Sequence, residues 1–68
     1  MSDGPEAAFV FQGAPHHAFE HGAFGTVESM REEAEEFLRS TGGLARVRVL
    51  ALPSEEVIWD SGAPNEWN

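Results

Sequence analysis

Residues 26–43, TVESMREEAEEFLRSTGG, decide the fold of this 68-residue chain. The apolar residues of this stretch follow the i, i+3, i+7, i+10, i+11 spacing of one helical face: Val27, Met30, Ala34, Phe37 and Leu38. At about 100° per residue, its glutamates fall on the other side: Glu28, Glu32, Glu33, Glu35 and Glu36. The stretch therefore predicts an amphipathic helix with one side for a hydrophobic core and a solvent side covered by carboxylates.

Both ends of this helix carry recognisable signals. Thr26 is a suitable N-cap, and Glu28 in the first turn complements the positive end of the helix dipole. Arg39 lies in the last turn, and Gly42-Gly43 favours a left-handed stop after it. Glu35 and Arg39, spaced i, i+4, are expected to form an ion pair on the helix surface.

The segments on either side of the helix have strand patterns. Residues 7–12, AAFVFQ, are apolar on both faces, which favours a central strand. Residues 44–52 alternate, and their small apolar side suits a position beneath a helix: Ala45, Val47, Val49 and Ala51. A turn at residues 53–55 then returns residues 56–60 antiparallel, with Trp59 expected in the core.

Residues 16–24 are the ambiguous segment. They could return as a second strand after Gly13-Ala14-Pro15, although their alternation is imperfect and Gly22 weakens a strand. The fold class expected is α+β: a small antiparallel sheet of three to four strands in ββαββ order, with one amphipathic helix packed on one face. If residues 16–24 form a loop, the order becomes strand, helix, hairpin.

This arrangement divides the chain into three parts. Residues 1–6 are expected to be a flexible N-terminus, residues 7–60 a single domain, and residues 61–68 a C-terminal tail. Within the domain, Arg46 or Arg48 should face Glu55, Glu56 or Asp60 across the last hairpin, depending on register. The sheet side away from the helix would then combine leucine with arginine: Leu44, Arg46, Arg48, Leu50 and Leu52.

Three segments together carry a resemblance: Phe11-Gln12-Gly13, residues 19–24 (FEHGAF) and residues 33–38 (EAEEFL). Their order and spacing resemble those of small uncharacterised bacterial domains built as hairpin, helix and hairpin. The resemblance covers most of the chain and implies the same fold. It implies no activity.

The charge balance limits the kind of partner. The chain has twelve Asp and Glu residues against four arginines, no lysine, and a formal net charge of −8. Such a surface repels phosphate backbones and anionic membranes and attracts basic proteins, so direct nucleic-acid binding is not expected. The first residues do not resemble a signal peptide, and no apolar run approaches the ~20 residues of a membrane span. A cytoplasmic protein is expected.

The histidine cluster is the sharpest candidate for chemistry. His17, Glu20 and His21 match the H-x-x-E-H pattern of inverted zinc proteases, in which a helix aligns two imidazoles on one metal. Pro15 before and Gly22 after the cluster do not suit a helix, and 68 residues hardly provide a cleft. With no cysteine and no lysine nucleophile either, we expect no enzyme and no cofactor, and His17 and His21 remain only weak metal candidates.

The glutamate side of the helix has two interpretations: a solvated surface that keeps the chain soluble, or a docking surface for a basic partner whose groove normally holds nucleic acid. Small acidic α/β proteins with which phages block host defence are similar in size and charge. The docking hypothesis makes the chain a protein-binding module, an inhibitor or nucleic-acid-mimicking regulator. Its candidate contact residues are Glu28, Glu32, Glu35, Glu36, Arg46, Arg48, Leu50 and Trp67. The alternatives are a His-dependent metal-binding protein and a structural homodimeric subunit, paired through its sheet, with no small-molecule ligand.

Overall fold

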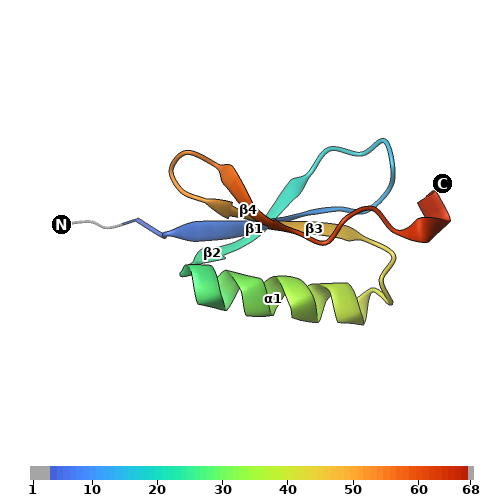
Figure 1. Ribbon diagram of the computed structural model, residues 1–68, viewed down its shortest axis with the longest axis horizontal. Helices are drawn as coiled ribbons and strands as arrows, with labels where there is room; N and C mark the ends of the chain where they lie inside the picture. Colours follow the sequence, from blue (N-terminus) through green and yellow to red (C-terminus); the bar gives the residue numbers. More distant parts are fainter. Residues whose placement is uncertain (1–3, 68) are drawn as a thin grey trace.

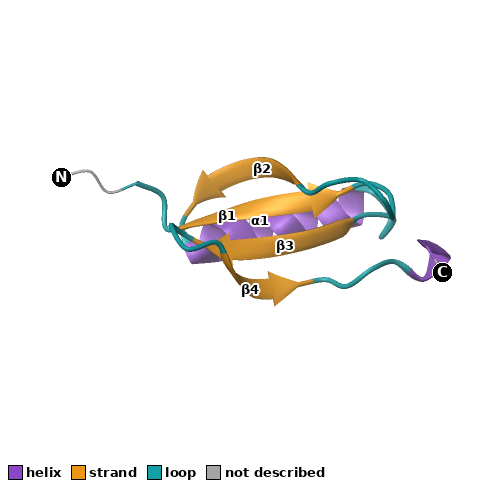
Figure 2. Cartoon of the chain, turned by 90° about the horizontal axis from the view of Figure 1, so that it is seen from above, coloured by secondary structure: helices purple, strands orange, loops and turns teal. Residues whose placement is uncertain are grey.

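A computed structural model describes residues 4–67 (Figure 1). The elements follow one another as β1 (Ala7–Gln12), β2 (Glu20–Gly25), α1 (Val27–Ser40), β3 (Arg46–Ala51), β4 (Glu56–Asp60) and a short 3₁₀ turn, η1 (Asn65–Trp67). The four strands form one antiparallel sheet in the order β2-β1-β3-β4, and α1 covers one of its faces (Figures 1 and 2). The predicted α+β fold in ββαββ order is confirmed.

β1 is an inner strand whose side chains are buried on both faces of the sheet, which is why it is apolar on both. Ala7, Ala8, Phe9 and Val10 are all buried, and β1 pairs with β2 on one side and β3 on the other. Phe9 faces α1, together with Val47 and Val49 of β3, which are fully buried in the same cluster. The small side of β3 therefore lies beneath the helix, as its alternation predicted.

α1 is held by its predicted apolar side. Met30 and Ala34 are buried against the sheet, and Val27, Phe37 and Leu38 pack around them. The Phe37 ring lies 4.8 Å from the Phe11 ring and 5.8 Å from the Phe9 ring, between centroids. The helix ends where Gly42 and Gly43 adopt φ values of 69° and 78°, and their amides donate to the carbonyls of Arg39 and Leu38. This is the predicted left-handed stop.

Thr26→Ala should lower the free energy of unfolding by about 1 kcal/mol, because the Thr26 hydroxyl accepts a hydrogen bond from the Ser29 amide at 3.1 Å. For a domain of this size, the melting temperature should fall by about 4–8 °C. Thr26→Ser keeps the hydroxyl and should stay close to the wild type in thermal unfolding followed by circular dichroism. Equal losses in the two variants would contradict the capping role.

Three local predictions need correction. Residues 16–19 are not part of a strand: the chain turns there, the His17 amide donates to the Ala14 carbonyl, and the Gln12 side-chain amide donates to the His17 carbonyl at 2.7 Å. β2 therefore begins at Glu20, and β3 is shorter than residues 44–52. On the helix, Glu35 pairs with Arg31 at 3.8 Å rather than with Arg39. Arg31 and Arg39 are each four residues from Glu35, and the ion pair forms with Arg31, the arginine that precedes it.

Both outer strands contain a bulge beside the inner pair. On β2 the extra residue is Gly22, between the pairs Phe9↔Ala23 and Val10↔His21. On β4 it is Ile58, between the pairs Leu50↔Val57 and Val49↔Trp59. At Gly22 the backbone passes over the Phe9 ring so closely that an added Cβ would lie 2.5 Å from Cε1 and 2.8 Å from Cε2, and closer still to Cζ. Only glycine fits this position without moving the ring.

Backbone pairing continues slightly beyond the named strands. The Glu6 amide donates to Gly25, and the Leu52 amide donates to Glu6. At the other end, the Ser61 amide donates to Val47, whose own amide donates to the Ser61 hydroxyl. Residues 1–3 of the predicted N-terminal segment and residue 68 of the predicted tail lie outside the described residues. Within residues 4–67, no helix has the length and hydropathy to cross a membrane.

Candidate functional site

The outer side of α1 presents its glutamates to solvent. We call this surface the acidic helix face; its residues, all exposed, are Glu28, Glu32, Glu33, Glu35 and Glu36. The helix carries only two cations, Arg31 and Arg39, so the face has a net negative charge. The Arg31 guanidinium lies 5.9 Å from the Trp59 ring centroid, at the flank of the helix towards β4. A shallow surface depression beside Arg31 is lined by Glu28, Glu32 and Glu35.

The opposite side of the molecule, the open sheet face, has no helix over it (Figure 1). Strand pairing aligns its side chains in two rows across the four strands. The first row, which we call the apolar row, consists of Phe24, Ala8, Leu50 and Val57. Phe24 and Val57 at its ends are 55% and 45% exposed, unusually high for large apolar side chains. The second row, the polar row, consists of His21, Val10, Arg48 and Asp60.

Asp60 is the centre of an ion-pair cluster in the polar row. Arg46 binds it through two nitrogens, Nε to Oδ1 at 3.1 Å and Nη2 to Oδ2 at 2.8 Å, and Arg48 Nε donates to Oδ2 at 2.9 Å. The Gly62 amide donates to Oδ1 at 2.9 Å. The Arg48 guanidinium also lies 4.4 Å from the centroid of the Phe19 ring. The sequence allowed Glu55, Glu56 or Asp60 as the partner of the two arginines, and in the structure the partner is Asp60.

These contacts change the acidity of the cluster. The hydrogen bonds from Arg46, helped by those from the Gly62 amide and Arg48, hold the pKa of Asp60 well below its usual range, although partial burial acts in the opposite direction. The same carboxylate raises the pKa of Arg46. Asp60 therefore stays ionised throughout the neutral range, paired with two arginines.

The histidines occupy different environments. His16 and His17 are exposed in the β1–β2 loop, whereas His21 lies on β2 with its ring stacked 5.4 Å from the Phe24 ring. Within the described part of the chain, no three His, Asp or Glu side chains are close enough to hold a metal ion. The H-x-x-E-H residues are thus on a loop and a strand, not on the helix that the zinc motif uses.

The remaining predicted contact residue, Trp67, closes the short η1 turn. Its amide donates to the Pro64 carbonyl at 3.1 Å, and its side chain is partly exposed. The structure thus distributes the sequence-predicted contact residues over two opposite faces and the C-terminal turn. Leu50, Arg46 and Arg48 lie together on the open sheet face, and the glutamates lie on the other side.

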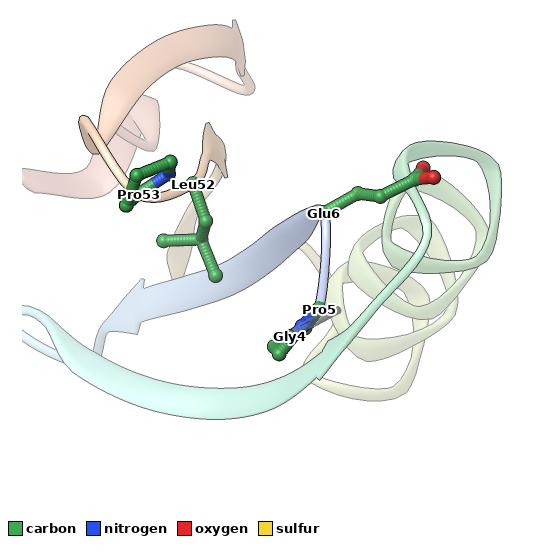
Figure 3. A pocket seen from close by; sticks show the side chains of 5 residues that line it. All are labelled: Gly4, Pro5, Glu6, Leu52 and Pro53. Carbon is green, nitrogen blue, oxygen red and sulfur yellow. The ribbon is translucent and has the colours of Figure 1, made fainter. Parts of the chain in front are cut away.

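Sequence reasoning missed two members of the open sheet face and one hollow. Phe24 and Val57 join Leu50 only through the strand order, although period-2 alternation within each strand is a signal for them. The hollow, of about 570 Å³, lies between the N-terminal segment and the β3–β4 turn. Figure 3 shows Gly4 and Pro5 on one side of it and Leu52 and Pro53 on the other, with the Glu6 side chain directed away. It lacks the convergent polar groups of a ligand site.

Comparisons of this chain with models of protein families, with curated proteins and with solved structures found no match.

Proposed function

We propose that this protein is a small binding module of the cytoplasm that docks a basic protein partner through its acidic helix face. The observation that supports this proposal is the arrangement of five exposed glutamates on one side of a helix with only two arginines. In this proposal the protein acts by occupying a surface, without catalysis and without a cofactor.

The helix is a firm support for such an interaction. Its first turn is capped by Thr26, its last turn is closed by Gly42 and Gly43, and Met30 and Ala34 anchor it to the sheet. Carboxylates on a preordered helix lose less conformational freedom on binding than carboxylates on a loop. Like charges gathered on one side also steer a basic partner towards that side and raise the association rate.

The charge pattern also points to a kind of partner. A protein surface that is basic enough to bind a row of carboxylates is typical of proteins that bind nucleic acid. Occupying that surface would make this module an inhibitor or a nucleic-acid-mimicking regulator. Arg46, Arg48 and Leu50 lie on the opposite face of the molecule, so this docking mode does not require them.

Charge reversal of Glu32 and Glu36 to lysine should abolish capture of the basic partner. The immobilised protein is exposed to a lysate of the source organism, and retained proteins are identified by mass spectrometry after elution with increasing NaCl. We expect a basic protein that is held by the wild type, released as salt screens the contact, and lost by at least tenfold in the double variant.

The matched control changes the net charge equally at exposed residues away from the helix, in Glu55→Lys with Glu66→Lys. It should retain the partner. If both double variants lose the partner equally, only the overall charge matters, and the acidic helix face is not the docking surface. If neither variant loses it, the face serves solubility alone.

A further inference from the structure

We propose that the basic partner places an arginine side chain in a groove at one edge of the acidic helix face, with its guanidinium on the Phe37 ring. The groove, of about 430 Å³, is open to solvent and is lined by Phe9, Glu33, Glu36, Phe37 and Ser40. We call it the Phe37 groove. This inference rests on the proposed function and names the side chain by which the partner would be recognised.

Phe37 supplies the accessible aromatic surface of the groove. Phe37 is partly exposed, whereas Phe9 is only 6% exposed and lies behind it. The Phe9 and Phe11 rings hold the Phe37 ring at centroid distances of 5.8 and 4.8 Å. α1 packs mainly on the inner strands β1 and β3, and the outer strand β2 has Gly22 beside the Phe9 ring, which adds no side chain there. A guanidinium can therefore lie against a ring that is already held in place.

Two carboxylates accompany this ring. Glu33 and Glu36 are exposed, are spaced i, i+3 on the helix and both line the groove. Neither makes an ion pair within residues 4–67, and no arginine of these residues lies over the Phe37 ring. Because the face of an aromatic ring is also negative, the ring and the carboxylates attract a cation to the same place.

The opposite flank of α1 shows how the same groups are paired when the chain supplies the arginine. There the Arg31 guanidinium lies 5.9 Å from the Trp59 ring centroid and pairs with Glu35 at 3.8 Å. At about 100° per residue, Glu33 projects about 160° away from Arg31, so Arg31 cannot serve the Phe37 groove. One flank thus has a ring, carboxylates and an arginine, and the other has a ring and carboxylates only.

A second example lies on the open sheet face. The Arg48 guanidinium lies 4.4 Å from the Phe19 ring centroid, and its Nε donates to Asp60 at 2.9 Å. In this molecule an arginine therefore contacts an aromatic ring and a carboxylate together at two separate places. The Phe37 groove offers the same two groups to an arginine from outside the chain.

Arginine is the basic side chain that suits both groups. Its planar guanidinium stacks on an aromatic ring and presents a fork of N–H donors to a carboxylate, whereas a lysine ammonium is a compact and strongly hydrated charge. An apolar side chain would remove water from Glu33 and Glu36 without replacing its hydrogen bonds. Surfaces that bind phosphate backbones carry arginine and lysine, so the proposed partner has the required side chain.

Two peptides of equal charge, nona-arginine and nona-lysine, test this inference by isothermal titration calorimetry at low ionic strength. The wild type should bind nona-arginine at least about fivefold more tightly than nona-lysine, because the stacked guanidinium adds to the attraction between charges. In the double variant Glu33→Gln with Glu36→Gln, both peptides should bind more weakly, and the preference for arginine should fall below about twofold.

The matched control, Glu28→Gln with Glu32→Gln, removes the same charge from the same helix beside Arg31. It should weaken both peptides but keep the wild-type preference for arginine. Phe37→Leu keeps an apolar side chain against the core and should lose the preference with both carboxylates in place, and circular dichroism checks that this variant is folded. Equal binding of the two peptides by the wild type, or the same change of preference in both glutamine pairs, would overturn the inference.

Nuclear magnetic resonance locates the bound peptide. We expect nuclear Overhauser contacts between the side-chain methylene groups of nona-arginine and the Phe37 ring, and their loss in Glu33→Gln with Glu36→Gln. Contacts found only with the Trp59 ring on the other flank would overturn the assignment of the groove.

The inference and the proposed function fail separately. If the lysate yields a basic partner that is lost on charge reversal of Glu32 and Glu36, but the wild type binds the two peptides equally, the proposed function stands and the arginine site is overturned. If the preference for arginine depends on Glu33, Glu36 and Phe37 but no basic protein is captured, the arginine site is supported and the proposed function is contradicted.

Discussion

Gly22→Ala should lower the free energy of unfolding by about 3 kcal/mol, at the upper end of the range for an overpacked core. The new Cβ would lie 2.5 Å from Cε1 and 2.8 Å from Cε2 of Phe9, a ring that is only 6% exposed. The ring cannot move away freely, because it packs against the rings of Phe11 and Phe37 on the helix side. A domain of this size has a total stability of about 3–10 kcal/mol, so much of the variant should be unfolded at 37 °C.

Urea unfolding followed by tryptophan fluorescence measures this effect. Gly13→Ala is the matched control, since no atom lies within 4 Å of the position of its Cβ; it should be neutral or slightly stabilising. Phe9→Leu removes the ring that the methyl group strikes. The double variant Gly22→Ala with Phe9→Leu should therefore be more stable, by about 1–2 kcal/mol, than the sum of the two single losses. Strict additivity would show that the ring contact is not the cause.

Asp60→Asn should lower the free energy of unfolding at pH 7 by about 1–2 kcal/mol. The substitution keeps an oxygen for the Gly62 amide but removes the charge that binds Arg46 and Arg48, and leaves two guanidinium groups side by side. The side chain is 27% exposed, so water screens part of the interaction and the loss stays below that of a fully buried pair. Glu56→Gln on the same strand, which makes no ion pair within residues 4–67, should change stability by less than about 0.5 kcal/mol.

The loss of unfolding free energy caused by Asp60→Asn should become smaller as the pH falls. The pKa of Asp60 is lowered on folding, so its contribution is complete above the pKa of the unfolded chain, about 3.9. As the pH falls below about 5, the unfolded carboxyl takes up a proton while the folded one stays ionised, and the contribution is progressively lost. The difference between wild type and Asp60→Asn should thus narrow between pH 5 and pH 2.5 in thermal unfolding. A constant difference would contradict the ion-pair explanation.

The helix was predictable because its signals are local. The 3.6-residue spacing of Val27, Met30 and Ala34, the hydroxyl of Thr26 and the glycines after the last turn act within a few residues of one another. β1 and β4 were predicted with correct bounds for a related reason, since short runs of apolar or alternating residues are bounded by turn residues. The fold class then followed from the order of these elements.

The structural features that could not be predicted from the sequence depend on pairing between distant segments. The start of β2 at Glu20 is determined by the turn that Gln12 holds in place, and the choice of Asp60 as the arginine partner is determined by the β3–β4 register with its extra residue. Neither the turn held by Gln12 nor the β3–β4 register produces a repeating pattern in the sequence. The same is true of the apolar row, because Phe24 and Val57 belong to opposite outer strands and become one surface only through the sheet order. The exposed glutamates, in contrast, could be located from helical periodicity alone.

The two bulges also bear on how this protein can assemble. Outer strands with a continuous, regular set of free amides and carbonyls accept further strands, and this is how sheets grow into aggregates. Here Gly22 and Ile58 interrupt that regular set on the two outer strands, one on each side of the sheet. Strand addition is therefore disfavoured at both sides, and growth into an extended fibre has no regular starting template. Edge-to-edge addition of further chains should accordingly not occur, even at millimolar concentration.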